Sequence, residues 1–409
     1  MPARDLNELG RVDEADVYKG ERLAAHLTRT KDGVIFAYTS AYLTSDSPPV
    51  ATSLPKSELP RLTSGGGVPP FFAGLLPEGR RLVALQRAVK TSADDELSLL
   101  LAIGEDAVGD VRVMPSGEVP KTVEPFVRVT KSFEEIRFSD LVKEFVGIDR
   151  VDRVGLAGVQ DKVSTGRISL PASRAGARFI LKLQSQEFPH VITNENYFLD
   201  VARRTHLRVA KAELVHDADG HSGLLVERFD RVLNSAGKSI SLAVEDACQV
   251  LDHWPADKYN FGAETVIEAL SNVCASRALA IREIYKQLCL AWLTGNGDLH
   301  AKNISLLSTP DGEWRISPAY DLPSTVPYGD HSLALAMGGK KVGHSRRSLI
   351  EFGRSVGLSE NLATKVLDEV LEATSRVVDE LRDGCLPFNQ QVTSDLIAEL
   401  RHRRRSAIN

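Results

Sequence analysis

The feature that most constrains the fold is a polar loop that interrupts the helical patterns of the C-terminal part of the chain. Residues 293–307, LTGNGDLHAKNISLL, follow a stretch with helical spacing, IREIYKQLCLAW, and run directly into a segment typical of a strand. A second short strand, WRISP, is predicted just before a polar turn, AYDLPST. The chain therefore needs a helical lobe with polar loops set into it, and these loops carry Asp298, Asn303 and Asp321.

These three residues have the chemical types that phosphoryl transfer needs. The reaction uses a carboxylate that accepts the hydroxyl proton, a neutral oxygen ligand for Mg²⁺, and a second carboxylate between metal and phosphates. Asp298 lies five residues before Asn303, and Asp321 follows in the order and spacing of kinase catalytic loops. We predict Asp298 as the base and Asn303 and Asp321 as metal ligands. The structural alternative is that the first two cap turns and Asp321 begins a helix.

Two upstream segments supply groups for the phosphates. Lys182 lies in the middle of a predicted strand, FILKL, and points opposite to Leu181 and Leu183. Such a lysine either extends to water or meets an anion, and we predict contact with nucleotide phosphates. The preceding segment VGLAGVQDKVSTGRI has Gly155 and Gly158, which permit a tight turn with N–H groups facing phosphate oxygens or form an ordinary hairpin.

The segment VERFDR, which begins at Glu227, ends a predicted hairpin where a hinge between two lobes would fall. Backbone groups there could read the adenine edge, with Phe229 lining the pocket and Asp230 near the ribose or the metal. The alternative is that Phe229 is core and Asp230 pairs with Arg228 or Arg231. His300 is expected to be structural, since Asp298 already fills the role of base.

Apolar periodicity divides the chain into three predicted segments. Residues 1–124 contain a strand pattern, GVIFAYTSAYL, and helix patterns after Pro77 and in DDELSLLLAIG, which predicts an α+β subdomain. Residues 125–245 contain strands (GRISLP, ARFILKLQ), one helix (NENYFLDVARRTHL) and a hairpin around Asp219-Gly220, as in a β-rich lobe. Residues 246–409 are predicted to be helical, with the helical pattern starting around VEDACQVL.

Two further expectations concern the C-terminal part. The stretch SENLATKVLDEVLEATSRVVDELRDG predicts one helix closed by Gly384, because a single apolar stripe runs through Leu362, Val366, Val370, Thr374 and Val377. The basic run Arg401–Arg405 comes after the apolar pattern stops. It is predicted to be a solvated tail, with phosphate contact as the alternative.

The amino-acid composition indicates which broad class of protein this is. Apolar residues make up 43% and charged residues 26%, which is typical of a soluble globular protein, and neither a signal peptide nor a spanning helix is expected. We therefore expect a cytoplasmic location. A net charge of −5 argues against a chain that coats nucleic acid by itself. No CxxC pair occurs, so we expect reduced, mostly buried thiols at Cys248, Cys274, Cys289 and Cys385.

Taken together, these residues resemble the HipA family of serine/threonine toxin kinases. The resemblance runs over essentially the whole chain, through FAYTSAYL, SLP, FFAGLLPEG, AGVQDK, ILKL, NENYFL, VERFDR, EDACQVL, DKY, GDLHAKN and PAYDLPST in this order. It implies an α+β protein with an atypical two-lobed kinase-like fold, related to lipid and actin-fragmin kinases, and a small N-terminal subdomain.

The resemblance also implies cofactors, partners and residue roles. The cofactors are ATP and Mg²⁺, with Asp298, Asn303 and Asp321 in the roles given above. The substrate is an aminoacyl-tRNA synthetase, most familiarly the glutamyl enzyme, and the partner is a small helix-turn-helix antitoxin that carries the contact with operator DNA. The residues implied around the nucleotide are Ala157, Gly158, Val159, Gln160, Asp161, Lys162, Lys182, Glu227, Arg228, Phe229, Asp230, His300, Ala301, Lys302, Asn303 and Tyr320.

One position departs from the family pattern. In well-known members a serine three residues before the second glycine of the nucleotide loop is autophosphorylated and silences the kinase. Here that position is Gly155. Either the brake is absent or Ser164 or Thr165 replaces it.

Two rival functions remain open at this point. The loop GDLHAKN also resembles that of aminoglycoside and choline phosphotransferases, but the motifs of residues 1–120 have no place there. A degenerate kinase kept as a co-repressor is the second rival, and the complete set Lys182, Asp298, Asn303 and Asp321 argues against it.

Overall fold

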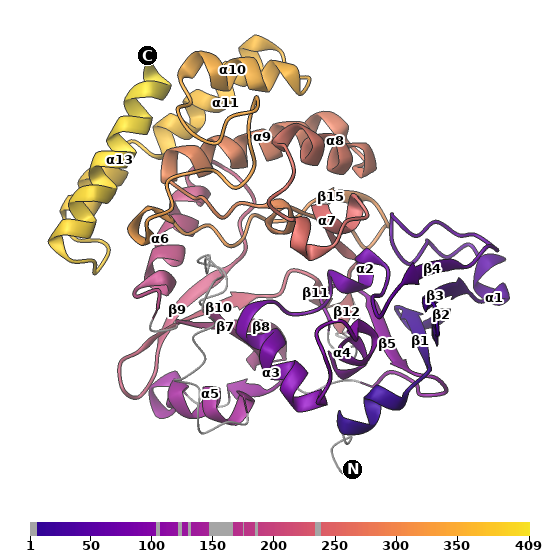
Figure 1. The fold of residues 1–409 in the computed structure, drawn as a ribbon. Helices are drawn as coiled ribbons and strands as arrows, with labels where there is room; N and C mark the ends of the chain where they lie inside the picture. The colour runs from indigo at the N-terminus through magenta and orange to yellow at the C-terminus, as the bar shows by residue number, and fades with distance from the viewer. Residues whose placement is uncertain are drawn as a thin grey trace. The chain divides into compact units, whose positions relative to one another are not determined.

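The computed structural model describes residues 6–103, 107–121, 125–129, 132–146, 167–174, 176–184, 187–233 and 239–409 (Figure 1). Contacts divide the chain into two compact units, each built from separate stretches of sequence. The first contains residues 1–124, 230–257 and 307–311, and the second contains residues 125–229, 258–306 and 312–409. Within the described residues, no helix combines the length and the apolar composition that a membrane crossing requires.

A five-stranded antiparallel sheet, in the order β4-β3-β2-β1-β5, forms the centre of the first unit. Its strands are β1 (Glu14–Lys19), β2 (Arg22–Thr30), β3 (Gly33–Tyr38), β4 (Arg61–Ser64) and β5 (Val111–Pro115). The helices are η1 (Leu6–Arg11), α1 (Ser40–Leu43), α2 (Pro70–Ala73), α3 (Gly79–Val89) and α4 (Glu96–Ile103). Buried Leu27 and Phe36 of the sheet share one core with Phe72 and Leu97. The predicted strand is confirmed as β3 over its first six residues, whereas Ser40–Leu43 at the end of that pattern form helix α1. The two predicted helices are confirmed as α3 and α4.

The segment 230–257 also belongs to the first unit. It contains β11 (Arg231–Leu233), β12 (Ser239–Ser241), β13 (Val244–Asp246), α7 (Ala247–Val250) and η5 (Pro255–Asp257). The prediction of a helix throughout VEDACQVL was therefore wrong for its first residues. Val244–Asp246 form a strand, and the helix begins only after Asp246, whose side chain caps it in a capping box with Gln249.

A buried carboxylate joins this segment to the N-terminal sheet region of the same unit. Glu245 is 1% exposed and accepts hydrogen bonds from the Thr52 backbone N–H (2.9 Å) and from the Thr52 hydroxyl (2.5 Å). Burial raises the pKa of Glu245 above its ordinary value, although the Thr52 donors and the charge of Lys19 oppose the shift. At pH values between the unfolded and the folded pKa, the folded protein therefore keeps a proton here that the unfolded chain has released.

This difference predicts that the stability of the protein falls with pH. Because the folded pKa of Glu245 is the higher one, the stability contributed by its protonation is complete below the unfolded value and is lost as pH rises through the folded value. Glu245→Gln keeps an acceptor for Thr52 and carries no charge. Its free energy of unfolding should therefore depend less on pH than that of wild type above about pH 4.5, near the ordinary pKa of glutamate. Urea denaturation across pH 4–8 measures both slopes, and equal slopes in the two proteins would contradict the prediction.

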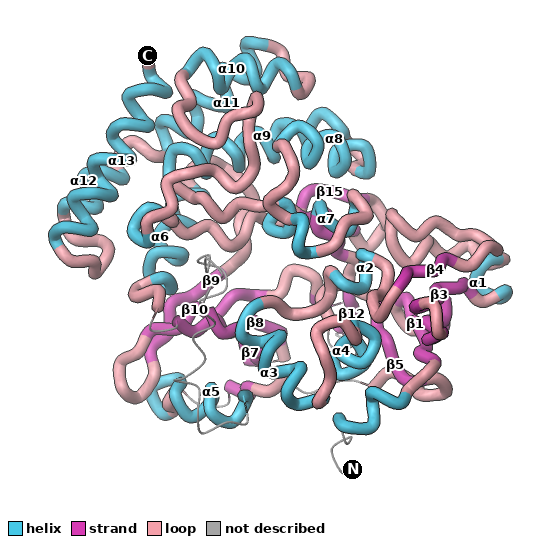
Figure 2. Tube along the Cα trace, viewed as in Figure 1, coloured by secondary structure: helices cyan, strands magenta, loops and turns pink. Residues whose placement is uncertain are grey.

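The second unit begins with a five-stranded sheet in the order β6-β7-β8-β10-β9. Its strands are β6 (Val127–Val129), β7 (Arg167–Arg174), β8 (Ala177–Gln184), β9 (Ala212–His216) and β10 (Ser222–Glu227), and only the β6–β7 pair is parallel. Figure 2 shows these strands in magenta with α5 (Phe138–Val146) and α6 (Val191–Arg203) in cyan beside them. The predicted strands GRISLP and ARFILKLQ, the helix NENYFLDVARRTHL and the Asp219-Gly220 hairpin are confirmed.

The rest of the second unit is mostly helical. Its helices are η2 (Phe133–Glu135), α8 (Ala263–Val273), α9 (Arg277–Thr294), η6 (Ala301–Asn303), η7 (Val326–Tyr328), α10 (Arg346–Ser355), α11 (Glu360–Ala373), α12 (Val377–Arg382) and α13 (Gln390–Ile408). Two short strands, β14 (Ser305–Ser308) and β15 (Trp314–Ile316), are neighbours in a small sheet.

Two predictions for the C-terminal part were wrong. The single helix predicted over residues 359–384 is two helices, because Thr374 ends α11 and returns its hydroxyl to the Val370 carbonyl (2.8 Å). The predicted basic tail is part of α13, and its Arg403 is 1% exposed. The four cysteines are free thiols, but only Cys248 and Cys289 are buried, whereas Cys274 is half-buried and Cys385 is exposed.

Candidate active site

A buried ion pair lies between the strand lysine and a helix of the second unit. The Lys182 ammonium of β8 is 2.6 Å from Glu195 Oε1 of α6, and the Glu195 side chain is 1% exposed. Leu181 and Leu183 point to the opposite face of the sheet, into a core cluster with Phe133 and Phe138. The alternation of the strand therefore places Lys182 against α6, as its sequence pattern indicates.

The same lysine lies 3.6 Å from Asp321 Oδ1. Asp321 has a φ of +57°, in the left-handed region that aspartate tolerates better than most residues. Just before it, the Ala319 N–H donates to the Arg208 carbonyl (2.7 Å) and the Ala319 carbonyl accepts from Ala210 (2.9 Å). The turn that presents Asp321 is therefore fixed by main-chain bonds to the segment that follows α6.

Helix α6 also holds the residues after Asp321. The Asn194 side chain donates to the Ser324 carbonyl (2.8 Å) and accepts from the Ser324 N–H (3.0 Å). Asn194 and Glu195 are consecutive, so one turn of α6 positions both Lys182 and the Asp321 segment. Lys182 thus contacts both a helix glutamate and the predicted metal-binding aspartate. Kinases use a strand lysine, a helix glutamate and an aspartate of this kind around nucleotide phosphates.

The predicted base lies on a loop that begins where α9 ends. Gly295 closes this helix with a φ of +67°, and Asp298 follows it, 1% exposed. The Asp298 N–H donates to the Asn296 side chain (2.8 Å), and the Tyr259 hydroxyl donates to Asp298 Oδ1 (2.7 Å). These bonds fix the direction of the carboxylate, which a general base needs because it must meet one particular proton.

The loop packs closely against residues 324–332. The Gly297 N–H donates to the Thr325 hydroxyl (2.8 Å). A Cβ atom on Gly297 would lie 2.4 Å from the Ser332 carbonyl oxygen and 2.7 Å from that hydroxyl. Only glycine fits there without moving the loop.

Gly297→Ala is therefore expected to lower kcat of phosphoryl transfer by about tenfold to a hundredfold, because a shift of about 1 Å misplaces the base. It should also cost about 1–3 kcal/mol of folding stability through overpacking. Gly10→Ala is the control, since a Cβ at Gly10 meets nothing within 4 Å. Steady-state kinetics below the melting transition test this prediction, and an unchanged kcat in the folded variant would contradict it.

The remaining loop residues cluster around Asn303 and Tyr320. The Asn303 side-chain nitrogen donates to the Asp298 carbonyl (2.8 Å), and the Tyr320 hydroxyl donates to the Lys302 carbonyl (2.8 Å). The Phe229 and Tyr320 rings are 5.9 Å apart. The structure thus brings together Phe229, the predicted catalytic loop and the turn of Asp321, although Phe229 lies far from the other two in sequence.

The residues predicted to hold Mg²⁺ fit such a cation chemically. Mg²⁺ prefers carboxylate and carbonyl oxygens. Asp321 offers a carboxylate, and Asn303 uses its amide nitrogen for the Asp298 carbonyl, so its amide oxygen is the atom that it can offer. With Lys182 beside Asp321, the site has a fixed positive charge for phosphate oxygens.

The other residues predicted to surround the nucleotide differ in their burial and hydrogen-bond partners. The N–H groups of Glu227 and Arg228 are bonded to the Lys211 and Arg178 carbonyls (2.8 and 2.9 Å). His300 is 2% exposed, and its ring packs edge-on against Tyr259. Ala301 donates its N–H to the Lys258 carbonyl (3.1 Å). The loop Ala157–Lys162 lies outside the described residues, as do Gly155, Ser164 and Thr165.

Asp230 differs from these residues because its carboxylate is used inside the first unit. It is 3% exposed and accepts hydrogen bonds from the Gly109 N–H (2.9 Å) and from Arg231 (2.6 Å). This is the pairing that the sequence left open as the structural alternative. A role for Asp230 at the nucleotide stays a prediction.

Sequence reasoning missed three residues that organise the site: Asn194, Glu195 and Tyr259. The glutamate could have been found, since it lies in the helix directly after the Lys182 strand, where kinases place their ion-pair partner. The other two give no local signal. Asn194 bonds to main chain 130 residues away, and Tyr259 reaches Asp298 39 residues away, so only the folded chain shows these pairs.

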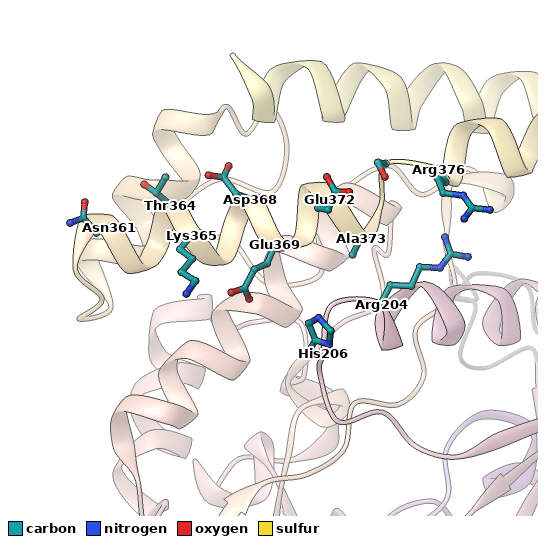
Figure 3. Close-up of a pocket in the computed structure, with 11 residues that line it drawn as sticks. Arg204, His206, Asn361, Thr364, Lys365, Asp368, Glu369, Glu372, Ala373 and Arg376 are labelled. Atoms are coloured by element: carbon teal, nitrogen blue, oxygen red, sulfur yellow. The ribbon is translucent and has the colours of Figure 1, made fainter.

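A cavity of about 960 Å³ lies elsewhere in the second unit (Figure 3). It is lined by the end of α6 and by α11, and Lys365 and Glu369 project from α11 on the side of Arg204 and His206. None of the predicted catalytic or nucleotide residues lines it. Because a cavity without the catalytic groups cannot perform the chemistry, we assign the active site to the cluster around Asp298.

Comparison with solved structures supports the fold. The HipA chain of a Shewanella oneidensis complex of HipA, HipB and operator DNA aligns with a TM-score of 0.77 over 96% of each chain, at 21% identity. At this identity the likeness shows the fold alone. The α+β class and the kinase-like architecture implied by the sequence are therefore confirmed.

Sequence comparisons identify the family. The HipA-like C-terminal domain model matches residues 154–378, and the HipA N-terminal domain model matches residues 15–114. Two Sinorhizobium fredii proteins named as kinase candidates, Y4mE and Y4dM, are 30% and 32% identical, each over 90% of this chain and 92% of its own length. The Shewanella oneidensis serine/threonine-protein kinase toxin HipA is 30% identical over 65% of both chains. This chain belongs to the HipA family of serine/threonine kinases.

Proposed function

We propose that this protein transfers the γ-phosphate of Mg²⁺-ATP to a serine or threonine hydroxyl of a protein substrate. The observation that carries the proposal is the contact set of Lys182 with Glu195 at 2.6 Å and with Asp321 at 3.6 Å. A lysine that is mostly buried between two carboxylates is poorly explained as a surface pair, since exposed pairs contribute little to stability. The position of Lys182 is well explained if its ammonium group contacts the phosphate oxygens of a bound nucleotide.

Each residue has one task in this proposal. Asp298 accepts the hydroxyl proton, and Tyr259 holds the carboxylate in the direction needed. Lys182 contacts phosphate oxygens, and Glu195 keeps its ammonium in place. Asn303 and Asp321 hold Mg²⁺. The bound ion neutralises charge that develops on the phosphates.

The nucleotide base is assigned to the Phe229 and Tyr320 rings. Their centroids are 5.9 Å apart and their planes are tilted by 40°, so an adenine could pack against these neighbouring rings. The N–H groups of Glu227 and Arg228 already donate to main-chain carbonyls. We therefore assign contacts with the adenine edge to other main-chain groups of this segment. Residues Ala157–Lys162 are assigned to the phosphates on the family resemblance.

The substrate and partner belong to the same proposal. We assign the substrate to the aminoacyl-tRNA synthetases, with the glutamyl enzyme first, and the partner to a helix-turn-helix antitoxin in the cytoplasm. Support comes from the Shewanella relative, which is named a toxin, and from the structural neighbour, which is bound to HipB and operator DNA. The net charge of −5 agrees with DNA contact made mainly through a partner.

The rival functions are weaker. The match of residues 15–114 to the HipA N-terminal domain argues against a small-molecule phosphotransferase. A co-repressor without activity has no need for the complete set of catalytic groups. Calorimetric titration with ATP, with and without Mg²⁺, separates an active kinase from the co-repressor. We expect Mg²⁺-dependent binding that Asp321→Asn weakens, and absence of nucleotide binding would leave the co-repressor.

A further inference from the structure

The only fully buried arginine of the C-terminal basic run lies directly behind the catalytic loop. The Arg403 side chain of α13 is 1% exposed, and its guanidinium lies 4.4 Å from the centre of the Trp292 ring. Its three nitrogens all donate hydrogen bonds: to Glu399 Oε1 (2.6 Å), to the Trp292 carbonyl (3.0 Å) and to the His331 carbonyl (2.6 Å).

The two carbonyl partners are the informative contacts. Trp292 is in the last turn of α9, where carbonyl groups attract positive charge, and its carbonyl also accepts from the Gly295 N–H that closes the helix (3.3 Å). The loop with Asp298 begins three residues later, at Gly295. His331 is in the segment whose Ser332 carbonyl and Thr325 hydroxyl enclose Gly297. The Arg403 guanidinium therefore bonds to both main-chain segments that flank the catalytic loop, namely the end of α9 and residues 324–332.

A second residue of α13 touches the same place. A Cβ atom added to Gly295 would lie 3.3 Å from Leu400 Cδ2, so this leucine contacts the start of the loop. Leu400 and Arg403 are three residues apart and share one face of α13. This face packs directly under the loop, whereas the exposed side chains of His402 and Arg405 point elsewhere.

Fold stability alone explains this arrangement poorly. Burying a guanidinium carries a large desolvation penalty, and burial lowers the pKa of Arg403 from its ordinary value. An apolar residue stacked on Trp292 would fill the same space without that penalty. Arginine supplies what an apolar residue does not, namely a rigid fork that fixes two carbonyl groups at a set separation.

We propose that Arg403 is a positioning residue, which holds the catalytic loop through the Trp292 and His331 carbonyls so that Asp298 is set for proton transfer. The inference rests on the proposed function in one respect, that the Asp298 loop is catalytic. It makes the end of α13, whose basic run was predicted from the sequence to be a solvated tail, a part of the active-site support.

The test compares Arg403→Met with Arg404→Met in the full-length protein. Arg404 is the matched control, because it is the next residue of α13 and also donates to a main-chain carbonyl, that of Leu371 (2.6 Å), but this carbonyl belongs to α11. Two readouts are needed: kcat and KM for ATP in γ-phosphate transfer by autophosphorylation, and hydrogen–deuterium exchange of residues 295–303 without nucleotide. Both are measured below the melting transition.

We expect Arg403→Met to lower kcat by about tenfold or more with KM for ATP nearly unchanged, because the base is misplaced while the nucleotide site is intact. Exchange in residues 295–303 should be faster on the order of tenfold, since the loop opens more often. Arg404→Met should lower the melting temperature but leave both readouts near wild type. Arg403→Lys, which keeps the charge but lacks the fork, replaces Arg403→Met if that variant does not fold.

The outcomes separate this inference from the proposed function. Equal losses of kcat in both variants, or unchanged exchange in Arg403→Met, would overturn the positioning role. A third outcome is that wild type transfers no phosphate, while Arg403→Met, but not Arg404→Met, speeds exchange of residues 295–303. Arg403 would then still position the loop, and the proposed kinase activity would be contradicted instead.

Discussion

Asp298→Asn is expected to lower kcat of phosphoryl transfer by about 10³-fold, within the range that a positioned general base contributes. The variant should remain folded, because asparagine keeps an oxygen that accepts the Tyr259 hydrogen bond and a neutral side chain is less costly to bury than a carboxylate. KM for ATP should change little, since the base acts on the acceptor hydroxyl and not on the nucleotide.

The control is Asp311→Asn, which removes an exposed carboxylate between β14 and β15. It should behave as wild type in both kcat and melting temperature. Single-turnover transfer and thermal melting of the two variants measure the effect. A kcat of Asp298→Asn within about threefold of wild type would exclude Asp298 as the base, because general-base catalysis contributes about a hundredfold or more.

Lys182→Met is expected to have the second large effect, on both activity and stability. Loss of the ammonium removes a group proposed to contact phosphates, so kcat/KM for ATP should fall by about a hundredfold. It also leaves the Glu195 carboxylate buried without its charge partner, which should cost about 3–5 kcal/mol of folding stability. Kinetics and urea denaturation measure the two effects separately.

The double variant Lys182→Met/Glu195→Gln separates a structural ion pair from a catalytic one. Neutralising Glu195 removes the buried charge that has lost Lys182, so the double variant should regain much of the stability but none of the activity. Arg174→Met is the surface control, because it breaks an exposed pair with Glu213 in the same sheet. If the double variant recovered activity together with stability, Lys182 would be a structural residue only.

The sequence predicted the local elements that repeat a simple pattern. The strand of Lys182 alternates apolar residues with period two, and the helix at residues 191–203 and the Asp219-Gly220 hairpin carry the usual periodicity and turn residues. The roles of Asp298, Asn303 and Asp321 stay predictions, drawn from the chemical types that phosphoryl transfer needs. The structure adds that Asp298 and Asn303 share one loop and are joined by a hydrogen bond.

Long-range contacts could not be predicted in the same way. Nothing near Glu245 indicates that Thr52 covers its carboxylate, and nothing near Asp298 indicates Tyr259. Arg403 is the clearest example of a contact that the local sequence does not indicate. In sequence it is one of four arginines in a polar run, which is typical of a solvated helix end or tail, and only the packing of α13 on Trp292 gives it a buried role.

The most direct test of the central claim is transfer of labelled γ-phosphate from Mg²⁺-ATP into a panel of purified aminoacyl-tRNA synthetases with tRNA present, by wild type and by Asp298→Asn. We expect wild type to label one synthetase and the variant to label none. Autophosphorylation lost in the variant, without a labelled synthetase, would keep the kinase and contradict the substrate class. Absence of any transfer by wild type would contradict the kinase itself.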